Sequence, residues 1–215
     1  MILLSLCQNL CPDQIPVVPG ERLGDGADGE VFEIKDEPDK VIKFCIFYDN
    51  DDCDAAIHYF EHTVPNLKYL INNPMPICAR VYAHMSMGSF RRDFASSKSG
   101  KQSFVLYNYI MEKLQKISED EKKVFHSILS HEDRGIEKNF TVEKVTEMLQ
   151  GLSRGLDFDA ERVIFFYEKL ISGSLIHMDL HPRNIMKDAE GNFKLIDFDR
   201  VQLKMEINND KSKQD

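Results

Sequence analysis

The chain has 215 residues, and its 27 lysines and arginines against 36 aspartates and glutamates give a formal net charge of −9. This acidic balance argues against non-specific nucleic-acid binding, which needs positive charge to displace counterions from phosphates. The length is enough for a sizeable core in one domain, and we expect two lobes around a cleft.

The cysteines predict a reducing environment, and the amino end shows no signal peptide. The number of cysteines is odd, and they form no C-x-x-C pair with matching histidines, so we expect free thiols and a cytoplasmic location. They are Cys7, Cys11, Cys45, Cys53 and Cys78. Residues 1–6 are apolar but lack the positive flank of a signal peptide, so an added strand or a docking segment is expected. We expect no membrane span.

A glycine-rich segment follows at residues 23–32, LGDGADGEVF. It places Gly24, Gly26 and Gly29 in the pattern G-x-G-x-x-G, with Val31 two residues later. A dinucleotide-binding turn uses the same glycines but leads into a helix, whereas residues 30–34 alternate like a strand. The segment therefore predicts a strand–turn–strand, in which glycine lets the backbone approach a bound phosphate.

The next elements are a strand with a lysine and a helix with a glutamate. Residues 41–44, VIKF, predict a strand that carries Lys43, after turn residues at 36–39. Residues 55–61 have helical character, and Glu61 lies eighteen residues past Lys43. Pro65 is expected to end or kink that helix.

The middle of the chain predicts a buried strand and then helices. Residues 104–112 are apolar and aromatic, so they predict a buried strand that ends with Met111 and Glu112, after a polar loop at 91–103. Ser118 and Glu121 have the spacing of a capping box. Apolar residues at helical spacing continue over 142–152 and 159–172.

The segment 177–199, HMDLHPRNIMKDAEGNFKLIDFD, carries the chemistry. It predicts a short strand, a polar loop, a hairpin and an acidic turn. The pattern H-x-D-x-x-x-x-N followed by D-F-x offers a base, Asp179, together with the amide of Asn184 and the carboxylate of Asp197. Hard Mg²⁺ prefers such oxygen ligands. These groups suit phosphoryl transfer from a metal-bound nucleotide.

This segment resembles the catalytic loop and metal-binding turn of the protein-kinase-like superfamily. The resemblance implies that Asp179 accepts the proton of the attacking hydroxyl and that Asn184 and Asp197 hold Mg²⁺, with Mn²⁺ as an alternative. It also implies that Lys43, in a sequence similar to V-A-I-K, contacts the α- and β-phosphates of ATP, with Glu61 as its partner.

The resemblance extends to the nucleotide-binding residues. Gly24, Gly26, Gly29 and Val31 would cover the phosphates, and Met111 would guard the back of the adenine pocket. Glu112, Lys113 and Leu114 would present hinge backbone groups to the adenine. His177 would support the backbone of the catalytic loop.

The implied fold is α+β and bilobal. It has an N-lobe of antiparallel sheet with one helix at residues 1–112, and a truncated, mainly helical C-lobe at 113–203. A polar tail, expected to be disordered, follows at 204–215.

Departures from the family pattern narrow the resemblance. Met178 stands where many regulated protein kinases have arginine, and Asp199 replaces the glycine of D-F-G. Residues 179–184 and 196–199 also resemble aminoglycoside and choline kinases. Because the chain ends eighteen residues after Asp197, we expect no activation segment. In size and truncation it resembles compact effector kinases that pathogenic bacteria inject, which would place it in a host cytosol.

Three functional hypotheses follow. The first is a protein serine/threonine kinase, active without activation-loop phosphorylation or switched by a partner that also supplies substrate docking. The second is a small-molecule kinase of the aminoglycoside or choline type, which an acidic pocket would favour. The third is a pseudokinase scaffold. Transfer of AMP by a flipped nucleotide also stays open.

Overall fold

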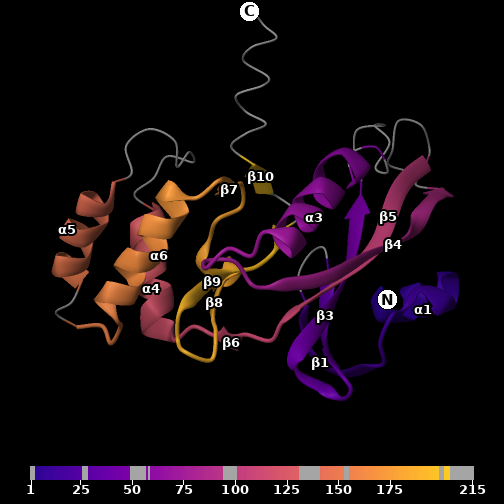
Figure 1. Cartoon of the computed structure of the whole chain (residues 1–215), viewed down its shortest axis with the longest axis horizontal. Helices are drawn as coiled ribbons and strands as arrows, with labels where there is room; N and C mark the ends of the chain where they lie inside the picture. Colours follow the sequence, from indigo (N-terminus) through magenta and orange to yellow (C-terminus); the bar gives the residue numbers. More distant parts are fainter. Residues whose placement is uncertain are drawn as a thin grey trace, which may run out of the picture. The chain divides into compact units, whose positions relative to one another are not determined.

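The structure, a computed structural model, describes residues 3–25, 29–48, 57, 59–93, 101–130, 141–152, 155–198 and 201–203. The fold is α+β, as the sequence predicts, with an antiparallel five-stranded sheet. The chain divides into two compact units, one of residues 1–74 and 80–113 and the other of residues 75–79 and 114–215 (Figure 1). Gly26, Cys53 and Asp199 lie outside the described residues, as does the tail at 204–215.

The first unit is built on the five-stranded sheet, whose strand order is β1-β2-β3-β5-β4. Its strands are β1 (Pro19–Asp25), β2 (Gly29–Ile34), β3 (Glu37–Tyr48), β4 (Val81–Asp93) and β5 (Lys101–Glu112). The expected strand–turn–strand is present at β1 and β2, where Gly24 pairs with Val31. The polar loop expected at 91–103 is shorter than predicted, because backbone pairing continues to Asp93 and Lys101.

One face of the sheet is covered by the amino end. Residues 3–10 form helix α1 (Leu3–Leu10), so the expected strand is wrong. Leu3 and Cys7 of α1 pack with Phe44 and other alternate residues of the sheet. The carboxylate of Glu30 accepts a hydrogen bond of 3.0 Å from the backbone N–H of Leu4, which satisfies a donor at the start of the helix.

The opposite face carries a helix of two parts, the π-helix η2 (Tyr59–Thr63) and α3 (Val64–Asn72). The rings of Tyr59 and Tyr107 lie 4.8 Å apart, which places this helix over the face that alternates with the one under α1. Pro65 was expected to end or kink the helix. It lies instead in the first turn of α3, where its missing N–H needs no partner.

In its described part, the second unit combines three α-helices with five short strands and one 3₁₀-helix. The helices are α4 (Glu119–Ser130), α5 (Val142–Leu152) and α6 (Ala160–Ser172). The strands are β6 (Gln115–Lys116), β7 (Leu175–His177), β8 (Ile185–Lys187), β9 (Phe193–Leu195) and β10 (Val201–Leu203). The described residues form the 3₁₀-helices η1 (Pro12–Gln14), in the first unit, and η3 (Pro182–Asn184), in the second.

Local capping explains where two of these helices begin. Ser118 and Glu121 form the predicted capping box, with reciprocal hydrogen bonds of 2.8 and 3.1 Å. The side chain of Asp159 accepts from the backbone N–H of Arg162 at the start of α6.

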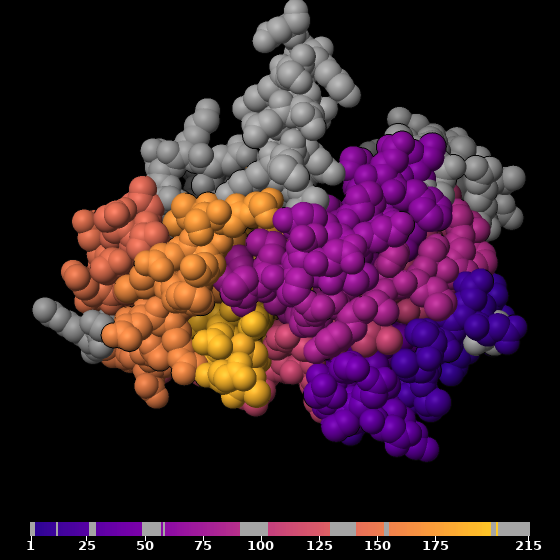
Figure 2. Space-filling view, viewed as in Figure 1, coloured from indigo at the N-terminus to yellow at the C-terminus, as the bar shows by residue number. Residues whose placement is uncertain are grey.

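Aromatic rings fill the core of the second unit beneath β9. Phe193 of β9 lies with its ring centroid 4.9 Å from that of Phe125 in α4 and 6.3 Å from that of Phe166 in α6. The turn at residues 188–192 reaches the surface beside α6 (Figure 2). The β8–β9 hairpin is therefore seated on both helices.

Residues 77–79 form backbone hydrogen bonds with Leu195 of β9. The backbone N–H of Leu195 donates to Ile77 O, and that of Ala79 donates to Leu195 O, at 2.6 and 2.8 Å. Residues 75–79, which connect α3 to β4 in the sequence, therefore belong to the second unit.

The structure also bears on the cysteines and on the membrane. Cys7, Cys11, Cys45 and Cys78 are buried free thiols, as expected. Burial raises the pKa of Cys7 and of Cys78 to about 12, so both remain protonated. In the part of the chain that is described, no helix has the length and apolar character needed to cross a membrane.

Helix α6 offers a paired test of this core. Phe166 is 1% exposed, whereas its neighbour Phe165 is 44% exposed. We expect Phe166→Ala to lower the free energy of unfolding by about 3–5 kcal/mol, because it leaves a cavity against Phe125 and Phe193. Phe165→Ala should change it by less than about 0.5 kcal/mol. Denaturant unfolding measures both, and equal losses would contradict this assignment of the core.

Candidate functional site

The imidazole of His177 joins the two halves of the segment that carries the predicted chemistry. His177 ends β7 and is 2% exposed. Its Nε2 lies 2.9 Å from the carbonyl oxygen of Ile196, and the backbone N–H of Asp179 lies 3.3 Å from its Nδ1. Both contacts are satisfied by the neutral tautomer that carries its proton on Nε2. One ring thus holds both the backbone N–H of Asp179 and the carbonyl of Ile196, the residue before Asp197.

Asn184 makes the second connection. Its side-chain Nδ2 donates to the backbone carbonyl of Asp179 at 2.9 Å. Its backbone carbonyl oxygen accepts from the N–H of Ile196 at 2.9 Å. Asn184 is 5% exposed, so this network is largely shielded from water. Since Nδ2 is engaged, the amide oxygen Oδ1 is the atom that can serve as a ligand.

Asp197 adopts an unusual backbone conformation. Its φ is 66°, in the left-handed region that residues other than glycine rarely occupy. The residue before it, Ile196, is held at both backbone groups: its N–H donates to Asn184 O and its carbonyl oxygen contacts His177. Phe198, the residue after it, is fully buried. Surroundings that over-determine a strained residue in this way are typical of functional sites.

Asp179, the predicted base, has its side chain 44% exposed, so an incoming group can reach it. The Nε2 of His181 lies 3.7 Å from one oxygen of this carboxylate, and its Nδ1 accepts from the N–H of Arg183 at 3.2 Å. In the sequence, only its position two residues after Asp179 marks His181. Its orientation by the backbone adds a polar group beside the base.

The donor atoms of Asn184 and Asp197 fit Mg²⁺. The described residues contain no cluster of three or more His, Cys, Asp or Glu side chains arranged to hold a metal. Mg²⁺ needs no such cluster, because it usually binds through one or two carboxylates together with substrate phosphates and water. One carboxylate and one amide oxygen meet that requirement.

In the first unit, Gly29 lies directly against Lys43. A Cβ atom added at Gly29 would stand 2.7 Å from the carbonyl oxygen of Phe44 and 2.9 Å from Cε of Lys43. No side chain fits there without displacing backbone. Gly24, in contrast, has nothing within 4 Å of an added Cβ. Of the two described glycines of the G-x-G-x-x-G pattern, Gly29 is therefore the one that has no room for a side chain.

Lys43 is buried on the sheet face that η2 and α3 cover. It is 8% exposed, it pairs with Val31 and Tyr109 in the neighbouring strands, and its Nζ lies 5.7 Å from the ring centroid of Tyr109. Glu61 lies in η2 and is exposed. The pairing of Glu61 with Lys43 stays a prediction from the sequence.

The residues predicted to form the hinge lie at the end of β5. Met111 is 5% exposed and pairs with Val41 and Val81. The N–H of Glu112 donates to Arg80 O at 2.9 Å, and the N–H of Lys113 donates to Asp39 O at 2.8 Å.

These two N–H groups are thus engaged within the first unit. Leu114, the first residue assigned to the second unit after β5, is half-buried. Its contact with adenine remains a prediction from the sequence, as do those of Met111 and Glu112.

Comparisons with known proteins do not assign this chain to a family. Comparison with protein families finds no match, and comparison with curated proteins finds none. The crystal structure of WbdD is similar with a TM-score of 0.39 and 18% identity, over 86% of this chain and 33% of that chain. WbdD co-crystallised with the kinase inhibitor LY294002 gives a TM-score of 0.38 and 16% identity, over 91% and 35%. This chain thus spans 33–35% of the WbdD chains, and similarity at this level assigns neither a family nor an activity.

The two glycines provide a matched pair of variants. We expect Gly29→Ala to lower the free energy of unfolding by about 1–3 kcal/mol, because the new methyl group overlaps Phe44 O and Lys43. Gly24→Ala should be neutral, or stabilising by up to about 1 kcal/mol. Thermal unfolding of both variants measures the difference, and a harmless Gly29→Ala would mean that β2 does not lie this close to β3.

The protonation of His177 predicts a pH dependence of stability. Burial lowers the pKa of His177 below its ordinary value of about 6.5, although the Ile196 carbonyl and nearby carboxylates oppose the shift. The unfolded chain therefore binds the proton more readily. The stabilising contribution is complete above about pH 6.5 and decreases as the pH falls through the lowered pKa.

We expect His177→Gln to flatten the dependence of unfolding free energy on pH below about 6.5. It should not abolish the dependence, because burial also lowers the pKa of His84. His126→Gln, at an exposed position of α4, is the control. Denaturant unfolding at several pH values gives the slopes, and an unchanged slope in His177→Gln would exclude this role.

Proposed function

We propose that the chain is an ATP- and Mg²⁺-dependent phosphotransferase, a kinase whose acceptor is a hydroxyl group. The observation that supports this most directly is the hydrogen-bond network of His177, Asn184 and Ile196. It fixes the backbone of Asp179 and holds the strained residue Asp197 beside Asn184. Three side chains with the chemistry of a base and two metal ligands thus come from one rigid segment.

The proposed reaction assigns a separate task to each of these residues. Asp179, being accessible, takes the proton of the acceptor hydroxyl as its oxygen bonds to the γ-phosphorus and the bond to the β–γ bridging oxygen breaks. Asn184 Oδ1 and Asp197 are the groups that would hold the metal. A bound Mg²⁺ supplies neutralisation of the charge on the phosphate oxygens.

The nucleotide-binding residues of the proposal lie in the first unit. Lys43 provides a buried cation on β3, and Gly29 places no side chain against its Cε, which would lie 2.9 Å from an added Cβ. Gly24, Gly26 and Val31 complete the predicted phosphate-binding hairpin. Positioning and charge neutralisation dominate such reactions, since phosphoryl transfer requires little covalent chemistry from the protein.

For the acceptor we propose serine or threonine hydroxyls of a protein, with a partner protein that supplies docking. After Asp179 the catalytic loop continues with His181 and Arg183. These side chains add imidazole and guanidinium groups, whereas an aminoglycoside or choline acceptor calls for carboxylates or aromatic rings around its cation.

Two substitutions should separate metal binding from proton transfer. Asp179→Asn should leave nucleotide binding unchanged and lower the turnover about 10²–10⁴-fold, the usual contribution of a positioned base. Asp197→Asn should abolish Mg²⁺-dependent nucleotide binding and turnover together. The assay is transfer from γ-labelled ATP with Mg²⁺, to lysate proteins and to aminoglycosides and choline in parallel, with nucleotide affinity measured by calorimetry.

The control is Asp157→Asn, which makes the same chemical change at an exposed position of the second unit. Labelled small molecules instead of proteins would move the assignment to a small-molecule kinase. Label from α-labelled ATP would identify AMP transfer. Full turnover in Asp179→Asn would show that the base is assigned wrongly, and bound ATP with no transfer would favour a scaffold.

A further inference from the structure

The hairpin of β8 and β9 determines how far apart the two proposed metal ligands lie. Asn184 directly precedes β8, and Asp197 follows β9 with one residue between them. Ile185 pairs with Leu195 across the ladder. A slip or tilt of either strand would therefore change the separation of the two ligand side chains.

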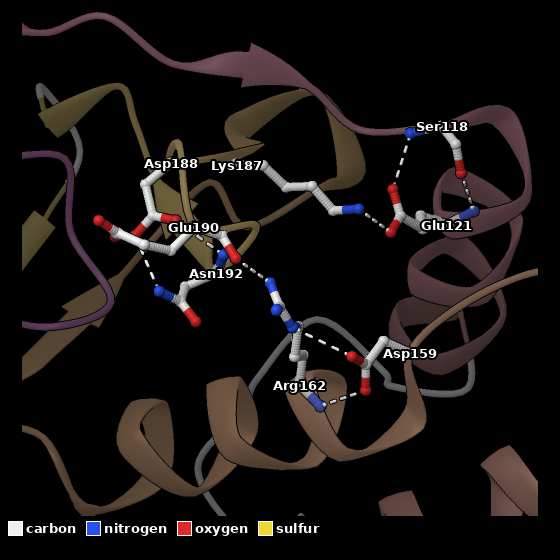
Figure 3. A network of polar contacts seen from close by, with 8 residues as sticks. All are labelled: Ser118, Glu121, Asp159, Arg162, Lys187, Asp188, Glu190 and Asn192. Atoms are coloured by element: carbon white, nitrogen blue, oxygen red, sulfur yellow. Dashed lines mark hydrogen bonds and ion pairs between the residues drawn. The ribbon is translucent and has the colours of Figure 1, made fainter.

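Lys187, at the end of β8, is paired with a buried carboxylate of α4. The side chain of Glu121 is only 4% exposed, and one of its oxygens forms an ion pair with Nζ of Lys187 (Figure 3). Its other oxygen accepts the backbone N–H of Ser118 at 2.8 Å. Because both oxygens of this buried group are engaged, the pair gives β8 a directional connection to the start of α4.

Arg162, from α6, holds the other end of the hairpin. Its guanidinium donates to the carbonyl oxygen of Glu190 and pairs with Asp159 at 3.0 Å (Figure 3). The same guanidinium occupies the position that a Cβ atom of Gly191 would take, and Gly191 has a φ of 83°. Only glycine permits this approach of the arginine to the turn.

The turn between the strands is itself rigid. Asp188 accepts from the backbone N–H of Asn192 at 2.8 Å and from its Nδ2 at 3.1 Å. Lys194 pairs with Asp188 at 3.3 Å. The constraint from Arg162 at the turn is therefore transmitted to both strands, rather than being lost in a flexible loop.

We propose that Lys187, Glu121 and Arg162 are positioning residues, which hold Asn184 and Asp197 at the separation that binds the metal–nucleotide complex. This inference rests on the proposed function. None of the three side chains is assigned to substrate or metal. Lys187 belongs to the hairpin itself, and Glu121 and Arg162 hold it from α4 and α6.

An ordinary ion pair on the same helix provides the comparison. Lys122 and Glu119 pair at 2.5 Å on the surface of α4, where their side chains are 40% and 79% exposed. Such an exposed pair is largely screened by water, so it contributes little to the position of neighbouring elements. Lys122→Met, like Lys187→Met, removes a lysine that pairs with a glutamate of α4. It leaves the pair between β8 and α4 intact.

The experiment measures binding of Mn²⁺ in the presence of ADP, by electron paramagnetic resonance, in chains shown to be folded. We expect Lys187→Met to raise the dissociation constant for Mn²⁺ roughly tenfold or more, the usual effect of removing a group that orients a ligand. Lys122→Met should have no effect, and Lys187→Arg should restore part of the affinity. Binding of ADP without metal should stay at the wild-type value in all variants, which a general loss of structure would not allow.

Hydrogen exchange gives a second measurement on the same samples. The amide of Ile196, which donates to Asn184 O, should exchange faster in Lys187→Met than in Lys122→Met. Should Lys187→Met fail to fold, Arg162→Leu tests the same inference from the other end of the hairpin, with the same expected loss of Mn²⁺ affinity.

Two failures are distinguishable. If the wild-type chain binds Mn²⁺ with ADP and the folded Lys187→Met and Arg162→Leu variants bind it equally well, the positioning role is overturned and the proposed function stands. If the wild-type chain itself does not bind Mn²⁺ with ADP, the proposed function is overturned, and the positioning role with it.

Discussion

The contact between the His177 imidazole and the Ile196 carbonyl is the constraint on which the candidate site depends. It crosses from β7 to the residue before Asp197, while the other nitrogen of the ring receives the N–H of Asp179. An imidazole has one acceptor nitrogen only when it is neutral, so both contacts require the uncharged ring. Burial enforces this state. A single buried side chain therefore holds the backbone of Asp179 and of Ile196, the residue before Asp197.

The second unit separates the rigid support of the site from the groups proposed to react. Asn184 and His177 are almost fully buried, whereas the carboxylate of Asp179 is 44% exposed. Buried hydrogen-bonded groups hold geometry well because alternative arrangements leave polar atoms unpaired. An exposed carboxylate remains hydrated and accessible. This division combines a backbone held by hydrogen bonds with a carboxylate that solvent can reach.

The sequence predicted features that depend on neighbouring residues, and it missed those that depend on distant ones. The start of α4 was predictable because Ser118 and Glu121 cap it locally. The amino-terminal helix was not, because the N–H of Leu4 in its first turn is satisfied by Glu30, far along the chain. In the site, the pattern of Asp179 and Asn184 was readable from spacing alone. The support from Lys187 was not, because its partner lies on a helix with no motif to mark it.

The pairing of residues 77–79 with Leu195 has a consequence for synthesis of the chain. These residues leave the ribosome long before β9 is made, flanked on both sides by elements of the first unit. Domains generally fold in the order in which they are synthesised. The backbone groups of residues 77–79 therefore remain hydrogen-bonded to water until β9 has been synthesised. Neither unit corresponds to an uninterrupted stretch of sequence, so cutting the chain at residue 113 would deprive the second unit of a strand partner.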